Sequence, residues 1–129
     1  MGTMRQIKFR AQDVASNKWL YGDLRHHKDD VCIFEQEGTK GEQEKRDTIG
    51  QYTGMHDKNG KEIYEGDIVL VSDWTSVYAS DYKGTVRFER GQWVVSYEKY
   101  GCKMTPRLFF DDFSDRKTTI IGNIHESNE

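Results

Sequence analysis

Two clusters of side chains in this sequence contain metal-ligand types. The first is the run HHKDDVC from His26 to Cys32, which brings imidazole, carboxylate and thiol groups together. Adjacent residues of a strand point to opposite faces, so His26 and His27 could not reach one ion together. No other stretch of the sequence supplies the remaining ligands that a tetrahedral metal site would need. We therefore expect a charged loop here and no metal site.

The second cluster consists of Asp111, Asp112 and Asp115. Three carboxylates could hold Mg²⁺ and support a metal-dependent hydrolase. Aspartate and serine in such a run are also typical of a turn or of the start of a helix, which is our interpretation. No nucleophile with a recognisable base accompanies either cluster. We predict no catalytic residues, no metal and no cofactor, and keep a hydrolase only as an alternative.

Aromatic side chains are candidates for a recognition surface. Trp74, Tyr78 and Tyr82 recur at four-residue spacing in a polar stretch. That spacing would place all three on one side of a short helix. Such side chains close a core or contact another molecule, and we expect core or interface here. They are our candidates for partner binding.

Binding of nucleic acid is the main alternative, because small β-barrels bind strands through basic grooves and stacking aromatic rings. Residues 7–11 alternate apolar and basic side chains, which predicts a strand with Lys8 and Arg10 facing outward. The net charge of −3 argues against nonspecific affinity over the whole surface. The candidate basic residues are Arg5, Lys8, Arg10, Arg87 and Arg90, with Trp74 or Tyr82 as stacking partners.

The longest strand-like signal lies in residues 49–71 and includes an Asn59-Gly60 turn. A two-residue loop would place Lys58 opposite Lys61, and like charges across a ladder are unfavourable. A type I turn that starts at Asp57, with Gly60 as the left-handed bulge residue, instead places Asp57 opposite Lys61. We expect this three-residue, bulged loop.

The turn leads into a predicted central strand. A second break at Gly66-Asp67 precedes the run IVLV at residues 68–71. Four consecutive β-formers predict a strand that is covered on both faces, near the centre of a sheet. Residues 85–89 and 93–97 alternate cleanly and predict an antiparallel hairpin. Its buried face is expected to contain Val86, Phe88, Trp93, Val95 and Tyr97.

The string QYTGMHDKNGKEIYEGDIV at residues 51–69 resembles the YopX family of phage and prophage proteins. The resemblance extends to IKFRAQD at residues 7–13 and to IIGNIHE at residues 120–126. It implies a mainly β fold, a small SH3-like barrel built from antiparallel hairpins with at most short helices. It also implies assembly as a homo-oligomer. It brings no catalytic residues.

We therefore predict one domain over residues 4–126, with residues 1–3 as an expression remnant and 127–129 as a frayed tail. Cys32 and Cys102 form no CxxC pair and are expected to be reduced thiols. No apolar run has membrane length, so the expected location is the cytoplasm of a bacterial host. The predicted function is a non-enzymatic, oligomeric interaction module with an unidentified protein partner.

Overall fold

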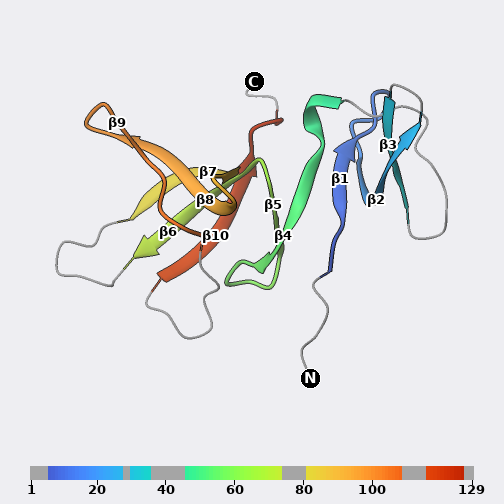
Figure 1. The fold of residues 1–129 in the computed structure, drawn as a ribbon. Helices are drawn as coiled ribbons and strands as arrows, with labels where there is room; N and C mark the ends of the chain where they lie inside the picture. Colours follow the sequence, from blue (N-terminus) through green and yellow to red (C-terminus); the bar gives the residue numbers. More distant parts are fainter. Residues whose placement is uncertain (1–5, 28–29, 36–45, 74–80, 109–115, 127–129) are drawn as a thin grey trace. The chain divides into compact units, whose positions relative to one another are not determined.

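β-Strands make up nearly all the regular structure of this chain (Figure 1). The structure is a computed structural model, and it describes residues 6–27, 30–35, 46–73, 81–108 and 116–126. Contacts between backbone positions divide the chain into two compact units, Met1–Gly54 and Met55–Glu129. The terminal segments 1–3 and 127–129 lie outside the described residues, and the domain boundary at 4–126 stays a prediction.

The first sheet has the strand order β3-β2-β1-β4-β5. A short 3₁₀ helix, Arg46–Thr48, precedes β4. β2 continues through the two histidines, and His26 pairs with Val31 of β3. The charged loop predicted from His26 onward is therefore wrong at its ends, because His26 and His27 lie in β2 and Asp30 begins β3, whose residues 31–34 form a strand as expected. The strands of this sheet are β1 (Phe9–Gln12), β2 (Trp19–His27), β3 (Asp30–Phe34), β4 (Gly50–His56) and β5 (Glu62–Tyr64).

The second sheet has the order β10-β6-β7-β8-β9, and every pair in it is antiparallel. The hairpin between β7 and β8 turns through Arg90 and Gly91, which both have positive φ, as a two-residue type I′ turn requires. The strands are β6 (Asp67–Asp73), β7 (Tyr82–Glu89), β8 (Gln92–Lys99), β9 (Cys102–Met104) and β10 (Arg116–Asn123).

The mainly β prediction is confirmed, but the closed barrel is wrong. Both sheets have two edge strands within the described residues, and neither closes on itself. A barrel needs its first and last strands to pair with each other. In the second sheet the outer edge of β10 is instead contacted by a turn, where the backbone N–H of Lys58 donates to the carbonyl oxygen of Thr118 at 2.9 Å.

The hydrophobic core of the second unit lies on one face of the second sheet. β6 is an interior strand, as the IVLV run predicts, and Val69 and Val71 are both buried, but Ile68 and Leu70 on its other face are only half-buried, so the predicted cover on both faces holds in part. Each such side chain contributes about 1.5–3 kcal/mol relative to an exposed one. The buried members of the cluster are Ile63, Val69, Val71, Val86, Val95 and Leu108.

The predicted buried face of the β7–β8 hairpin holds only in part. Val86 and Val95 face each other in the register and are both buried. Phe88, paired with Trp93, is 52% exposed. Phe88 lies next to the hairpin turn, and its ring packs edge-on against Trp93 with the ring centres 4.9 Å apart. Strand alternation gives the face of a side chain but cannot show where along the strand the core ends.

Candidate functional site

Of the three aromatic residues predicted to bind a partner, only Tyr82 lies in the described part of the chain. Trp74 and Tyr78 lie outside the described residues, as do Asp111, Asp112 and Asp115. Tyr82 is the first residue of β7 and packs against the core of the second unit. Its ring stacks on Tyr97 with the centroids 4.6 Å apart and the planes at 18°.

The predicted basic residues divide between the two units. Lys8 and Arg10 belong to the first unit, whereas Arg87 and Arg90 are exposed in the second, and Arg5 lies outside the described residues. The predicted outward position of Arg10 is wrong, since the residue is only 6% exposed. Its guanidinium lies 4.3 Å above the ring centre of Trp19. A planar, weakly hydrated guanidinium can be covered in this way because it stacks on the face of an indole.

Arg10 is part of a larger arrangement that the sequence analysis missed. Residues opposite each other in an antiparallel pair lie on the same face, and Arg10 is opposite Tyr21. Lys8, which immediately precedes β1, places its ammonium 5.3 Å from the ring centre of Tyr52. On β2, Arg25 places its guanidinium 4.1 Å from the ring centre of Phe34. We call this set the cation–aromatic face: Lys8, Arg10, Trp19, Tyr21, Arg25, Phe34 and Tyr52.

A signal for this face exists in the sequence. Trp19, Tyr21 and Arg25 occupy alternate positions of β2, so they share one side of the strand. Trp19 finds its partner Arg10 on β1, and Arg25 finds its partner Phe34 on β3, and only strand pairing reveals these contacts.

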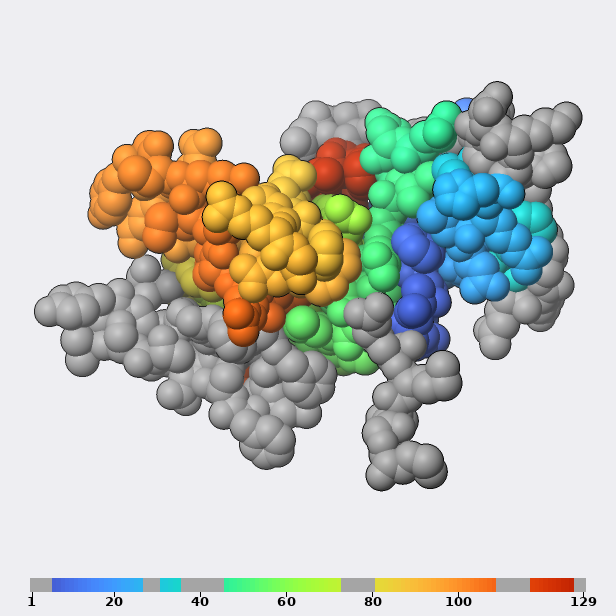
Figure 2. Space-filling view, in the orientation of Figure 1, coloured from blue at the N-terminus to red at the C-terminus, as the bar shows by residue number. Residues whose placement is uncertain are grey.

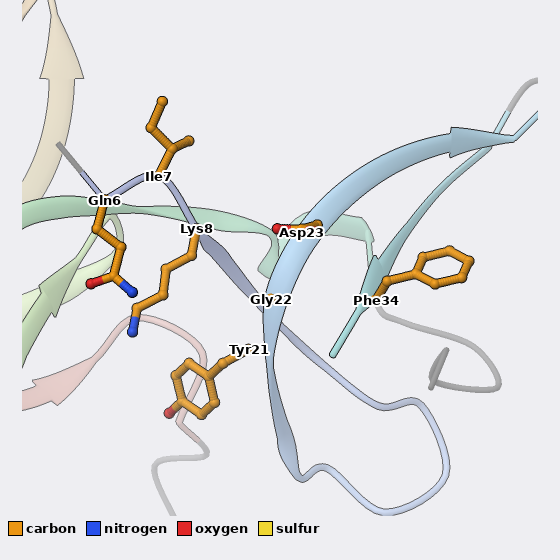
Figure 3. Close-up of a pocket in the computed structure, with 7 residues that line it drawn as sticks. All are labelled: Gln6, Ile7, Lys8, Tyr21, Gly22, Asp23 and Phe34. Carbon is orange, nitrogen blue, oxygen red and sulfur yellow. The ribbon is translucent and has the colours of Figure 1, made fainter. Parts of the chain in front are cut away.

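A groove of about 330 Å³ opens beside this face (Figure 3). β1 pairs with β2 only from Phe9 onward, so residues 6–8 run past Gly22 without pairing to β2, while the carbonyl oxygen of Lys8 accepts a hydrogen bond from the backbone N–H of Tyr52 in β4 at 2.9 Å. In Figure 3 the side chains of Gln6 and Lys8 extend to the same side of the strand as the Tyr21 ring. The lining residues are Gln6, Ile7, Lys8, Tyr21, Gly22, Asp23 and Phe34.

The groove offers groups for binding rather than for bond breaking. Tyr21 is 44% exposed and presents a ring, Lys8 an ammonium and Asp23 a carboxylate. None of the lining side chains is a thiol or an imidazole, and no nucleophile is paired with a base among them. Among the residues that the structure describes, no three His, Cys, Asp or Glu side chains gather as a metal site would require.

A different cluster surrounds Asp57 in the second unit. Asp57 is 6% exposed, and its Oδ1 accepts hydrogen bonds from the backbone N–H groups of Asn59 and Lys61, both at 2.9 Å. The backbone N–H of Gly60 donates to the carbonyl oxygen of Asp57 at 3.0 Å, with φ of Gly60 at +83°. The backbone N–H of Asp57 donates to the carbonyl oxygen of Lys61 at 2.8 Å. These bonds define a three-residue loop with Gly60 as the bulge residue.

The Asp57 carboxylate also contacts β10, an edge strand of the second sheet. Its Oδ2 accepts a hydrogen bond from the backbone N–H of Ile120 in β10 at 3.1 Å. With the bond from Lys58 to Thr118, the turn satisfies polar groups on the outer edge of β10. Covering an edge strand in this way prevents it from pairing with another chain. The Asp57 turn is therefore a structural clamp on β10.

The second predicted turn makes a comparable set of contacts. Asp67 is buried, and its Oδ2 accepts a hydrogen bond from the backbone N–H of Tyr64 at 2.8 Å. Gly66 has φ at +92°, and its carbonyl oxygen accepts a hydrogen bond from the backbone N–H of Ile124 at 3.0 Å. Asp67 is also opposite Asn123 in the register. Residues 57–67 and 118–124 thus form one hydrogen-bonded cluster.

Comparison with known proteins identifies the family. A family model described as "YopX protein" matches residues 8–129. The chain belongs to the YopX family. This YopX-family chain is also similar to protein EF1440 from Enterococcus faecalis, whose crystal structure aligns with a TM-score of 0.48 at 21% identity over 95% of each chain. A search of the curated proteins finds no match.

The central and C-terminal parts of the YopX resemblance meet in the turn cluster, whereas residues 7–13 belong to the first unit. Asp57, Gly60, Gly66 and Asp67 all take part in backbone hydrogen bonds or adopt the positive φ that a turn requires. Their partners come from residues 118–124, which overlap the C-terminal part of the resemblance. The roles of these residues in this YopX-family chain are therefore structural.

Proposed function

We propose that this YopX-family chain is a non-enzymatic interaction module of phage or prophage biology that acts as a homo-oligomer in the bacterial cytoplasm. Its partner would be another protein, contacted through apolar side chains. The proposal rests mainly on one observation, the exposure of large apolar side chains on the β7–β9 arm of the second unit.

Three large apolar side chains of this arm are exposed: Phe88, Tyr100 and Met104. Phe88 is 52% exposed beside the β7–β8 turn, and Tyr100 is 93% exposed in the β8–β9 turn. Figure 2 shows the β8–β9 hairpin (orange) as a protruding part of the surface. Exposed apolar side chains are normal when they are scattered, but several on one arm favour a contact with another chain.

The hydrogen bonding of the buried carboxylates in the described part of the chain supports the non-enzymatic part of the proposal. The buried carboxylates of Asp57 and Asp67 accept hydrogen bonds from backbone N–H groups of their own turns. A general acid or base must be within reach of a substrate proton. Carboxylates that are buried and bonded in this way are poorly placed for that role. No helix in the described residues is both long and apolar enough to cross a bilayer.

Light scattering after size-exclusion chromatography tests the proposal. We expect one species with a mass above that of the monomer at micromolar protein concentration. Phe88→Ser and Met104→Ser should shift it towards the monomer, because each removes apolar area worth about 25 cal/mol per Å² at the interface.

Val14→Ser is the matched control, since Val14 is exposed but belongs to the first unit. This variant should keep the mass of the natural sequence. A monodisperse monomer at all concentrations would contradict the homo-oligomer. If Val14→Ser lowered the measured mass of the oligomer as much as Phe88→Ser, the assignment of the contact to the β7–β9 arm would be contradicted.

A further inference from the structure

We propose that the groove beside Tyr21 binds single-stranded nucleic acid, with a base stacked on the Tyr21 ring and a backbone phosphate held by Lys8. This site belongs to the first unit, whereas the proposed oligomer contacts belong to the second. The two proposals can therefore fail separately.

Tyr21 supplies a stacking platform beside open space. Its ring is 44% exposed and borders the groove of about 330 Å³. Stacking of a base on an aromatic side chain tolerates any sequence, because every base has a π-face. Arg10 lies opposite Tyr21 in the register and is itself stacked on Trp19. The Tyr21 ring thus belongs to the β1–β2 strand pair, in which the neighbouring Arg10 side chain is held by its contact with Trp19.

Two cationic groups lie on the same face as the Tyr21 ring, and the Asp23 carboxylate lies between Tyr21 and Arg25 on that face. Lys8 lines the groove and is held at the face of Tyr52, and Arg25 follows on the same side of β2 as Tyr21. A single strand presents bases and phosphates in alternation, so it requires alternating rings and cations. Arg10 and Tyr52 of the cation–aromatic face are buried, so Lys8, Tyr21 and Arg25 are its members that would contact a strand.

The chemistry of the groove favours nucleic acid over an apolar peptide. An apolar peptide would require an apolar floor, but the lining includes Gln6, Lys8 and Asp23. Asp23 is a carboxylate in a site proposed for an anion, and it should weaken binding. Its side chain is 4.0 Å from that of Arg25, which offsets part of its charge. We therefore expect weak, salt-dependent affinity and a specific effect of removing the Asp23 charge.

Fluorescence anisotropy with labelled oligo(dT) and oligo(rU) of about 15 nucleotides tests the site, with salt raised from ~50 to ~200 mM. Tyr21→Ala should weaken binding about tenfold, whereas Tyr21→Phe should stay within about twofold because it keeps the ring. Lys8→Gln should lower the salt dependence by about 0.7 in log–log slope, the value for one lost contact to a single strand. Asp23→Asn should strengthen binding.

Arg90→Gln is the matched control, because it makes the same change of charge as Lys8→Gln at an exposed turn of the second unit. Its affinity and salt dependence should equal those of the natural sequence. Circular dichroism of each variant checks that the fold is kept, and the Tyr21→Phe and Asp23→Asn pair keeps the test decisive if Tyr21→Ala unfolds.

Three results would overturn the proposal. The first is no salt-sensitive binding tighter than about 10⁻⁴ M, the weak end of ordinary nonspecific affinity. The second is an effect of Arg90→Gln as large as that of Lys8→Gln, which would indicate diffuse attraction. The third is chemical-shift changes at Tyr21 and Lys8 on addition of a peptide but not of either oligonucleotide, which would assign the groove to a protein partner.

Discussion

Asp57→Ala is expected to lower the free energy of unfolding by about 3 kcal/mol. The substitution removes the acceptor of three backbone N–H groups, those of Asn59, Lys61 and Ile120. A buried donor left without an acceptor costs about 1–3 kcal/mol, and water can reach the exposed turn more easily than the N–H of Ile120 in β10. Most of the loss should therefore come from the contact with β10. Urea denaturation measures it.

Asp57→Asn separates the hydrogen bonds that this carboxylate accepts within its own turn from the one that it accepts from β10. The amide keeps one oxygen, which can still accept the bonds within the turn. Its NH₂ group would then face the N–H of Ile120, where two donors meet. We expect the free energy of unfolding to fall by about 1–2 kcal/mol, so that the stability lies between that of the natural sequence and that of Asp57→Ala.

Asp47→Ala is the matched control for Asp57. Asp47 is exposed in the 3₁₀ helix, and its replacement should change stability by less than about 0.5 kcal/mol. Equal unfolding curves for Asp57→Ala and Asp47→Ala would show that the Asp57 turn does not hold β10.

Gly22→Ala should be nearly as destabilising as Asp57→Ala, but in the first unit. A Cβ at Gly22 would overlap the carbonyl oxygen of Phe34 and lie 2.8 Å from its carbonyl carbon and 3.0 Å from Cα of Glu35. These are backbone atoms and cannot rotate away, so β2 and β3 would have to separate. We expect a loss of about 3 kcal/mol, at the upper end of the cost of overpacking. Thermal unfolding measures it.

Gly101→Ala distinguishes this clash from ordinary backbone strain. Gly101 has φ at +76° but open space around the position of a Cβ. A left-handed alanine there should cost about 1–2 kcal/mol, and no strands need to separate. If Gly22→Ala were as stable as the natural sequence, the close approach of β2 and β3 at Phe34 would be incorrect.

Local features of the fold could be predicted from the sequence. The turn at Gly60 follows from a residue type that tolerates positive φ and from the like charges that a two-residue loop would oppose. The buried strand at Val69 and Val71 follows from a run of β-formers. Both depend on residues that are close in sequence, and both agree with the structure.

Features that depend on distant partners could not be predicted. Ile120 lies 63 residues from the carboxylate that accepts the hydrogen bond of its N–H, so the sequence of the turn alone could not predict the clamp on β10. Alternation in residues 7–11 placed Arg10 outward, because a single strand does not reveal the Trp19 ring on its neighbour. The same limit applies to the cation–aromatic face and to the sheets that do not close into a barrel.

The Asp57 turn, in the central part of the YopX resemblance, holds the edge of β10 as a structural clamp. Amide hydrogen exchange at Ile120, followed by NMR, tests it most directly. We expect the Ile120 amide to be protected in the natural sequence and to exchange much faster in Asp57→Ala, with the amide of Val69 in the interior strand still protected. An Ile120 amide that exchanges at the rate of an exposed group in the natural sequence would contradict the clamp.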